Sequence, residues 1–346
     1  MTDLPSDPLS LSFDIYQRYR QVTELIHAIA PARPLSLLDV GGEMPYLRLF
    51  LPEASLTVVD RAFPGSRDSS RGLVVADGTQ LPFRAASIDL AVSVDSLEHV
   101  PTPERLDYLR ELRRVSKLGV VLAAPFDSED VREAERVVAD LYHALYGSPH
   151  RWLEEHRRYG LPSLPATLEF FRASGDHVSV VPNGYLPRWV AMLTAQVVSA
   201  MGERERMAYE RLCRYYSEHF YSHDRRTPAY RHVILAARTA PSRLPVPDEI
   251  GPGPFESASV DFTALMTPVL EAISRDAAAL RDTSAEITIL RSRVSALEEH
   301  LLTLTGSLGG RLVERFRALA DRMAPPKTGR QKALRGVLSA LRRLVR

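Results

Sequence analysis

Residues 37–42 read LLDVGG, a short apolar stretch that ends in an acidic residue and continues with two glycines. Followed by PYLRLFL at 45–51, this pattern predicts a buried strand that turns sharply into a helix. Glycine permits such a turn and lets a ligand approach the backbone closely. A second strand, SLTVVD at 55–60, ends on Asp60, 21 positions after Asp39. An acidic residue at that offset is placed to accept both hydroxyls of a ribose, which predicts a site for a nucleoside-containing cofactor.

Short apolar strands and helices alternate over the first 240 residues. Further strands are expected at 72–77, 88–95, 119–126, 177–184 and 230–238, and helices at 12–30, 101–116, 165–175 and 186–201. This alternation predicts an α/β fold in which a parallel sheet lies between helices. Ligands of such sheets bind at the carboxyl ends of the strands, and the predicted strand ends carry Asp39, Asp60, Asp77 and Asp95. Residues 127–165 interrupt the alternation and are expected to form a helical insertion over this edge.

The composition is that of an ordinary soluble protein, with 45% hydrophobic and 25% charged residues. Cys213 is the single cysteine, so no intramolecular disulfide is expected. No stretch reaches the roughly 20 apolar residues of a membrane span, and the N-terminal MTDLPSDPLS lacks the features of a signal peptide. These features predict a cytoplasmic protein that at most binds peripherally to the inner face of the plasma membrane.

The C-terminal third has a different organisation, and the first domain is expected to span 1–240. Residues 241–259 are rich in proline and glycine and predict a linker. Over 260–308 apolar residues recur every seven positions, which predicts a coiled coil and therefore a homo-oligomer, dimer or trimer. A single long helix packed on its own domain is the alternative. One heptad position holds Met266, Ile273, Leu280, Ile287, Val294, Leu301 and Leu308, and its partner position holds Val269, Leu290, Leu297 and Leu304.

Residues 309–346 predict two basic amphipathic helices, separated by Pro325 and Pro326. From Thr305 to the end, eleven basic residues stand against two acidic ones, although the whole chain has a net charge of only +1. An apolar stripe beside a cationic face predicts binding to an anionic membrane surface. A merely solvated helical end and nucleic-acid binding are alternatives. No nucleic acid is expected, because phosphate contacts alone would not require the apolar stripes.

Residues 35–126 resemble the class I S-adenosylmethionine-dependent methyltransferases of the small-molecule type that contain an LEHV segment. The resemblance rests on four motifs in order: LLDVGG at 37–42, VVD at 58–60, VADGTQLPF at 75–83 and SVDSLEHVP at 93–101. It implies a Rossmann-like seven-stranded sheet and S-adenosyl-L-methionine as the cofactor.

The resemblance also assigns roles to the motif residues. Gly41 and Gly42 would approach the methionine part of the cofactor, and Asp60 would hold the ribose. Asp77 would accept a hydrogen bond from the adenine amino group, with Gly78 allowing the turn. The remaining residues of the implied cofactor site are Asp39, Glu43 and Asp95, of which Asp95 would border the methionine end.

The first motif departs from the family pattern at two positions that usually hold glycine, because Glu43 and Pro45 occupy them. Glu43 can still contact the cofactor's ammonium group, whereas Pro45 fixes the turn and removes a donor. This departure favours an alternative function, a non-catalytic assembly protein that organises glycan enzymes at the membrane. Retention of Asp60 and Asp77 favours an enzyme. A nicotinamide dehydrogenase fits less well, because the turn lacks the GxGxxG spacing.

Methyl transfer to a hydroxyl requires positioning and a base, and His99 and His156 are the candidate catalytic residues. His99 follows the fourth strand; His156 lies in the expected insertion with His150 and Glu155. The alternatives are a helix-start histidine bonded to backbone for His99 and a surface position for His156. One cysteine and scattered histidines do not supply a structural zinc site, so no metal is expected.

The segment SLGGRLVERFRALADRM at 307–323 is similar to the tail of bacterial proteins that build cell-surface polysaccharides. This resemblance implies O-methylation of a sugar hydroxyl, or methylation of a sugar-linked phosphate, during synthesis of such a polysaccharide. The expected partners are a glycan or other small-molecule acceptor, a second copy of the chain and an anionic membrane.

Overall fold

In the computed structural model of the chain, residues 4–29, 34–63, 72–241 and 292–295 are described. The chain divides into two compact units, Met1–Ser274 and Arg275–Arg346. In the second unit only 292–295 are described, and they are helical. The predicted linker at 241–259, coiled coil at 260–308 and basic helices at 309–346 otherwise lie outside the described residues, apart from Pro241.

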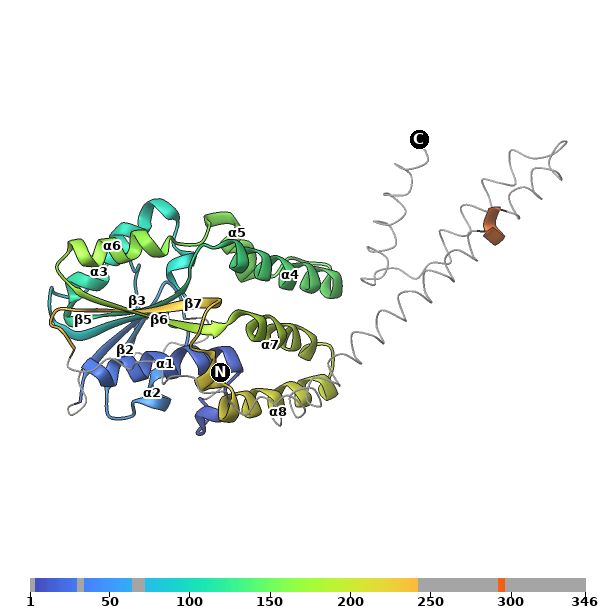
Figure 1. The fold of residues 1–346 in the computed structure, drawn as a ribbon, viewed down its shortest axis with the longest axis horizontal. Helices are drawn as coiled ribbons and strands as arrows, with labels where there is room; N and C mark the ends of the chain where they lie inside the picture. Colours follow the sequence, from blue (N-terminus) through green and yellow to red (C-terminus); the bar gives the residue numbers. More distant parts are fainter. Residues whose placement is uncertain (1–3, 30–33, 64–71, 242–291, 296–346) are drawn as a thin grey trace. The chain divides into compact units, whose positions relative to one another are not determined.

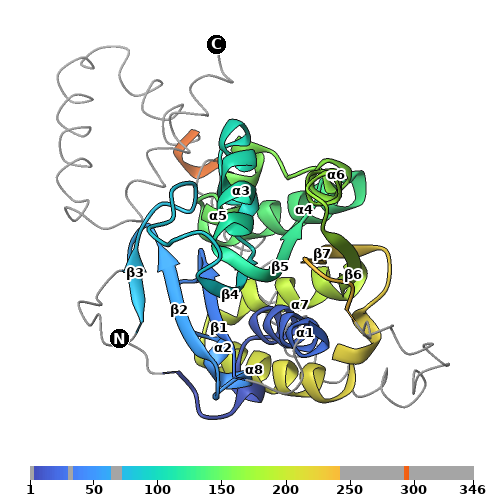
Figure 2. The ribbon, with the colours of Figure 1, turned by 90° about the vertical axis from the view of Figure 1, so that its left-hand side faces the viewer.

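Seven strands of the first unit form one sheet in the order β3-β2-β1-β4-β5-β7-β6 (Figure 2). The strands are β1 (Ser36–Val40), β2 (Ser55–Asp60), β3 (Leu73–Val75), β4 (Ile88–Val94), β5 (Ser116–Pro125), β6 (His177–Tyr185) and β7 (Ala229–Ala237). Each lies where the apolar pattern predicts it, and the Rossmann-like seven-stranded sheet is confirmed.

The expectation of an all-parallel sheet is wrong for one strand. Strands β1 to β5 pair in parallel, whereas β7 pairs antiparallel with both β5 and β6. The connection from β6 to β7 contains two helices, α7 (Leu186–Ser199) and α8 (Glu203–His219). A single helix between two strands returns the chain to the edge at which the first strand began, so the second strand runs parallel to it. The two helices between β6 and β7 instead return the chain to the edge at which β6 ends. Strand β7 therefore runs in the opposite direction.

Helices cover both faces of the sheet (Figure 1). Helices α1 (Phe13–Ile29) and α2 (Leu47–Phe50) pack on one face, and α3 (Arg105–Val115) and α6 (Leu164–Ala173) on the other. Successive residues of β1 serve both layers, because Leu37 packs with α1 and Leu38 with α3. Strands buried on both faces read as continuous apolar runs, as these do.

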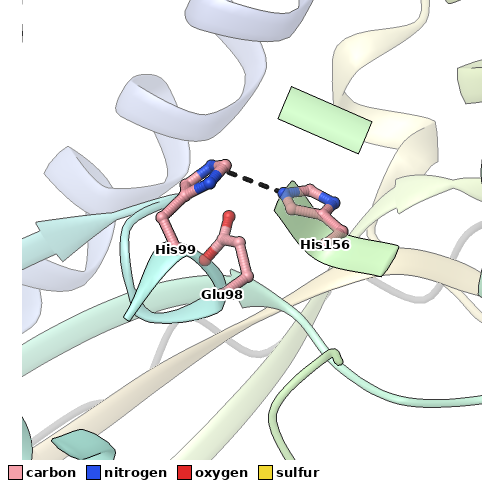
Figure 3. A group of neighbouring side chains, drawn as sticks. All are labelled: Glu98, His99 and His156. Carbon is pink, nitrogen blue, oxygen red and sulfur yellow. Dashed lines mark hydrogen bonds between the residues drawn. The ribbon is translucent and has the colours of Figure 1, made fainter. Parts of the chain in front are cut away.

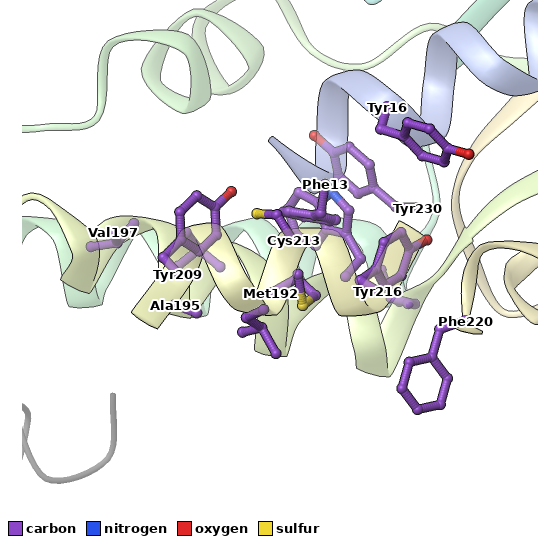
Figure 4. Close-up of a cluster of buried hydrophobic side chains, with 14 of the residues drawn as sticks. Phe13, Tyr16, Met192, Ala195, Val197, Tyr209, Cys213, Tyr216, Phe220 and Tyr230 are labelled. Atoms are coloured by element: carbon purple, nitrogen blue, oxygen red, sulfur yellow. The ribbon is translucent and has the colours of Figure 1, made fainter. Parts of the chain in front are cut away.

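A further hydrophobic core, made of helices, lies beside the sheet. It joins the start of α1 to α4 (Glu129–Tyr146), α5 (Arg151–Tyr159), α7 and α8. Figure 4 shows its aromatic character, with Phe13 and Tyr216 in edge contact, 5.6 Å between ring centroids. Residues 127–165, expected as a helical insertion, thus contain α4, α5 and the start of α6, and α5 packs against the turn after β4. No helix among the described residues is long and apolar enough to cross a membrane.

Strand β7 is tied to the rest of the unit by Arg231, whose side chain is only 1% exposed. Its guanidinium makes two hydrogen bonds to the Asp95 carboxylate, of 3.0 and 2.6 Å, and one of 2.7 Å to Asp14. It also donates to the side-chain oxygens of Gln17, at 3.0 Å, and Asn183, at 3.1 Å. Burial lowers the pKa of Arg231, but Asp14 and Asp95 outweigh burial and raise it above its usual value. The buried charge is therefore retained and fully hydrogen-bonded.

We expect Arg231→Met to lower the free energy of unfolding by about 3–5 kcal/mol, because it leaves buried carboxylates without their partner. Urea unfolding of the full chain, followed by tryptophan fluorescence, measures this change, since both tryptophans, Trp152 and Trp189, belong to this unit. Arg136→Met is the control, because Arg136 is an exposed arginine paired with exposed carboxylates. Equal stability of the two variants would contradict the structural role of Arg231.

Candidate active site

The acidic residues expected at the cofactor site lie at one edge of the sheet. Strands β1, β2 and β4 run in parallel, so their carboxyl ends meet there, and Asp39, Asp60 and Asp95 lie at or just after these ends. Asp77 follows β3 at the same edge. In α/β sheets this is the edge at which ligands bind.

The turn after β1 requires glycine at Gly41. Its φ is 86°, and a Cβ atom there would lie 2.1 Å from Oγ and 2.6 Å from Cβ of Ser96. A Cβ at Gly42 would lie 2.9 Å from Asp39 and from Val58. The Ser96 side chain, from the turn after β4, therefore packs directly on the backbone at Gly41, where only glycine fits.

The two unusual residues of this turn are accommodated without loss of helical hydrogen bonds. Glu43 is exposed. Pro45 precedes α2, and its carbonyl accepts a 3.0 Å hydrogen bond from Arg48. A proline just before a helix removes a donor that the helix does not use, so Pro45 starts the turn into α2 and does not disrupt it.

Asp39 is a fully buried carboxylic acid behind the glycine turn. Its Oδ2 atom lies 3.5 Å from the Tyr19 hydroxyl, whereas Oδ1 has no hydrogen-bond partner among the described residues. Burial raises the pKa of Asp39 to about 7, although the nearby Arg18 lowers it. Near neutral pH this group therefore changes charge readily and leaves one acceptor oxygen available.

The outer end of the edge contains Asp60 and Asp77. Asp60 is partly buried and accepts a 3.1 Å hydrogen bond from the Ala62 amide. Asp77 accepts from the amide and hydroxyl of Thr79, at 2.8 and 2.7 Å, and pairs with Arg61 at 2.9 Å. Burial raises the pKa of Asp77, but these hydrogen bonds outweigh it and the net shift is downward. An open cavity of about 470 Å³ adjoins this loop, lined by Asp77, Thr79, Gln80, Glu104, Asp107, Arg110 and Glu111.

The loop after β3 also rests on a close backbone approach. A Cβ at Gly78 would lie 2.4 Å from the Tyr108 ring. The Tyr108 hydroxyl in turn donates to the Val40 carbonyl at 3.1 Å. Helix α3 thus holds the Gly78 loop and the end of β1 against each other.

Asp95 has a positive φ of 46° and is held by two arginines that the sequence interpretation missed. Arg231 bonds both of its oxygens, and Arg18 of α1 reaches Oδ2 at 2.7 Å. The arginines lower the pKa of Asp95, although burial opposes them. Asp95 is therefore a permanently ionised structural residue beside the glycine turn. Little in the sequence indicates that Asp95 is paired, because both arginines are distant along the chain.

The two predicted catalytic histidines lie together (Figure 3). His99 ends a short helical turn, Leu97–His99, and His156 lies on α5; their Nε2 atoms are 3.4 Å apart. Each Nδ1 atom bonds a carboxylate, at 2.9 Å to Glu155 for His99 and at 2.7 Å to Glu135 for His156. The alternatives are wrong: His99 bonds a side chain, and His156 is only 6% exposed.

Residues around this pair complete the site. The Tyr230 hydroxyl donates to the same Glu135 oxygen at 2.9 Å, which fixes the acceptor of His156. Burial, followed by the neighbouring His156, lowers the pKa of His99 to about 4, so His99 is neutral at physiological pH. Trp152, 38% exposed, meets the His99 ring edge-on with the centroids 5.1 Å apart. His150 lies outside the pair and instead caps the start of α5.

Glu98 has no role in the sequence interpretation, although it lies in the SVDSLEHVP motif. It is 1% exposed, and its Oε2 atom has no hydrogen-bond partner among the residues that the structure describes. Burial, followed by the charge of Asp95, raises the pKa of Glu98 well above its usual value. Such an uncompensated acid deep in a site is typical of a group that awaits a ligand.

We expect the buried Asp39 to destabilise the fold as pH rises. The pKa of Asp39 is higher in the folded state than in the unfolded chain, so between pH 4 and 7 the folded state binds more protons than the unfolded chain. The free energy of unfolding therefore falls as pH rises through this range. Asp39→Asn should therefore gain stability relative to the native chain by up to about 4 kcal/mol between pH 4 and pH 8. Urea unfolding at both pH values measures the difference, with the exposed Asp107→Asn as control. A difference independent of pH would contradict this assignment.

The arrangement fits S-adenosylmethionine. The unpartnered Asp39 oxygen suits an ammonium group, and Asp60 and Asp77 stand at the successive strand ends where ribose and adenine are expected.

Comparisons with known proteins agree with this arrangement. A family described as a methyltransferase domain matches residues 43–124. An uncharacterized methyltransferase of Mycolicibacterium gilvum is 29% identical over 189 residues, 47% of this chain and 70% of the relative. One from Mycobacterium tuberculosis is 29% identical over 187 residues, 46% of this chain and 69% of the relative.

Among solved structures, a 1,6-didemethyltoxoflavin-N1-methyltransferase of Burkholderia thailandensis with bound S-adenosylhomocysteine is 14% identical. It covers 64% of this chain and 78% of its own, with a TM-score of 0.37. The matching methyltransferase domain and the methyltransferase relatives show that the chain is an S-adenosylmethionine-dependent methyltransferase.

Proposed function

We propose that this methyltransferase transfers a methyl group to a sugar hydroxyl during synthesis of a cell-surface polysaccharide. The observation that carries the proposal is the exposed Trp152 ring beside the buried His99 and His156 pair. An indole offers a flat apolar surface to the face of a sugar ring, while nearby polar groups orient its hydroxyls. His99 follows Ser96 by one short turn, and Ser96 lies against Gly41.

The cofactor is bound along the strand ends. Gly41 and Gly42 contact its methionine part, Asp60 holds the ribose and Asp77 accepts from adenine. Arg18, whose side chain is 21% exposed, keeps a positive charge at the methionine end, which suits the cofactor's carboxylate. When bound, S-adenosylmethionine supplies an electrophilic methyl group.

The chain's own residues orient the acceptor and take its proton. Trp152 positions the sugar, and the methylated oxygen loses its proton to the histidine pair. His156 is the better base of the two, because burial lowers the pKa of His99. Glu135 accepts from the Nδ1 atom of His156 and stabilises the positive charge that develops on the ring. Helix α5 supplies both His156 and Trp152, so a single element presents the acceptor to the strand ends.

A polysaccharide acceptor accords with the rest of the sequence. Such glycans are assembled on lipid carriers, and a membrane-binding tail at 309–346 and an oligomer formed through 260–308 would hold the enzyme near them. Both segments are expectations from the sequence alone, because they lie outside the described residues apart from 292–295.

We expect Asp60→Asn to weaken S-adenosylmethionine binding by about 10- to 100-fold, because charge-assisted hydrogen bonds to the ribose are lost. Isothermal titration calorimetry on the full chain measures the affinity. Glu53→Gln, an exposed change in the turn after α2, is the matched control. Unchanged affinity in Asp60→Asn would contradict the assignment of Asp60 to the ribose.

The acceptor is tested with S-adenosylmethionine labelled in its methyl group and glycan fractions from the source cells. We expect label in the polysaccharide or its lipid-linked precursor, recovered after acid hydrolysis as an O-methyl sugar. Trp152→Ala should raise KM for the glycan about tenfold, with Trp152→Phe intermediate and cofactor affinity unchanged in both. Label confined to protein, nucleic acid or a non-sugar metabolite would overturn the sugar assignment.

A further inference from the structure

Two histidine nitrogens face each other with no donor between them. The Nδ1 atoms of His99 and His156 lie against the carboxylates of Glu155 and Glu135. A carboxylate only accepts, and Glu135 also accepts from the Tyr230 hydroxyl, so each Nδ1 atom carries the ring proton. Both Nε2 atoms then present lone pairs to each other at 3.4 Å.

Glu98 adds a third acceptor to the same space. Figure 3 shows its carboxylate directed toward the gap between the two imidazoles. The Oε2 atom is buried without a hydrogen-bond partner among the described residues. One ligand atom from each of Glu98, His99 and His156 lies within 4.8 Å of the others.

Three converging acceptors repel one another unless protons or a cation lie between them. Satisfying them with protons takes one on Glu98 and one between the imidazoles, whereas a single cation binds all three ligand atoms at once. We propose that Glu98, His99 and His156 bind one divalent transition-metal ion, of the class of Zn²⁺, between the turn after β4 and α5.

The ligand set and its surroundings suit this class of ion. Two imidazoles and one carboxylate bind Zn²⁺, Fe²⁺ or Co²⁺ rather than Ca²⁺ or Mg²⁺, which prefer oxygen. Metal-bound histidines usually donate their other ring nitrogen to a carboxylate, as both do here. Bonds of about 2.0–2.2 Å at tetrahedral angles place ligand atoms about 3.4 Å apart. The two Nε2 atoms already have this separation, and a pair as far apart as 4.8 Å would close by rather more than about 1 Å, through a shift of the Glu98 side chain.

Three protein ligands leave an open coordination position. Asp95, the nearest other acid of the motif, does not fill it, because Arg18 and Arg231 engage both of its oxygens. An oxygen of an exogenous molecule is the natural fourth ligand, as in catalytic sites and unlike closed structural sites.

The ion would also change how the acceptor is activated, a consequence that rests on the proposed function. A sugar hydroxyl bound at the open position loses its proton to solvent more readily, because the ion stabilises the alkoxide. The oxygen then bonds to the methyl carbon, and the carbon–sulfur bond breaks with its electron pair left on sulfur. His99 and His156 would act as ligands and not as bases.

The test uses the untagged full chain, stripped with a chelator and titrated by calorimetry with ZnCl₂ and CoCl₂. We expect one ion per chain, with the visible spectrum of Co²⁺ bound to nitrogen and oxygen ligands. Glu98→Gln should weaken binding at least tenfold and His156→Ala at least 100-fold. His150→Ala, at the N-cap of the same helix but outside the cluster, should bind normally.

Folding and function are separated by two further measurements. Zn²⁺ should raise the melting temperature of the native chain and of His150→Ala but not of the isosteric Glu98→Gln. No binding below about 1 mM in the native chain, or equal binding in all variants, would overturn the ion site. Sugar methylation that persists in chelator would reject the ion's role in catalysis but not the proposed function. Ion binding without sugar methylation would reject the proposed function but not the ion site.

Discussion

The buried pair of Arg231 and Asp95 is the interaction on which the site depends. Removing a guanidinium and a carboxylate from water costs several kcal/mol for each ion, and the cost is offset only when every donor and acceptor finds a partner. Arg231 meets this condition by drawing on α1, β4 and β6 at once. The pair also holds Asp95 at a positive φ, a strained conformation that surrounding contacts must maintain. That conformation directs the following turn, so that Ser96 meets Gly41 while Glu98 and His99 face α5.

The helical core contributes to the site through a second chain of contacts. Trp189 of α7 stacks on Tyr230 with 3.6 Å between ring centroids and 13° between planes. Tyr230 donates to Glu135 of α4, and Glu135 holds His156 of α5. Packing among helices thus sets the orientation of a polar group at the strand ends. This explains why a methyltransferase sheet is accompanied here by so large an aromatic cluster, in which most hydroxyls have raised pKa values through burial.

The local features of this fold could be predicted, because they depend on short-range periodicity. The apolar runs located all seven strands, and the strand-end acids lie together at one edge of the sheet, as expected. What the sequence could not provide was pairing across long separations. Asp95 looked like a strand-end acid, whereas its two arginines lie 77 and 136 positions away. One signal was visible, since a charged residue inside the apolar run YRHVILAAR is unusual unless it is paired. The reversed direction of β7 also depends on how α7 and α8 pack, which no local pattern records.

The three acids nearest the methyl-transfer edge differ because their surroundings differ. Asp95 is ionised by two arginines and is fully compensated within the chain. Asp39 and Glu98 are equally buried but lack such partners, and burial raises the pKa of each. Each therefore holds a proton more readily than usual, and a bound cation would displace that proton. In our proposals, a cofactor that carries an ammonium and a sulfonium group would bring positive charge to Asp39, and a divalent ion would bring it to Glu98. The chain alone therefore leaves two buried carboxyls without an ionic partner, one on the proposed cofactor side and one on the proposed acceptor side. Each ligand would bind most strongly where the protein alone leaves a carboxylate unsatisfied.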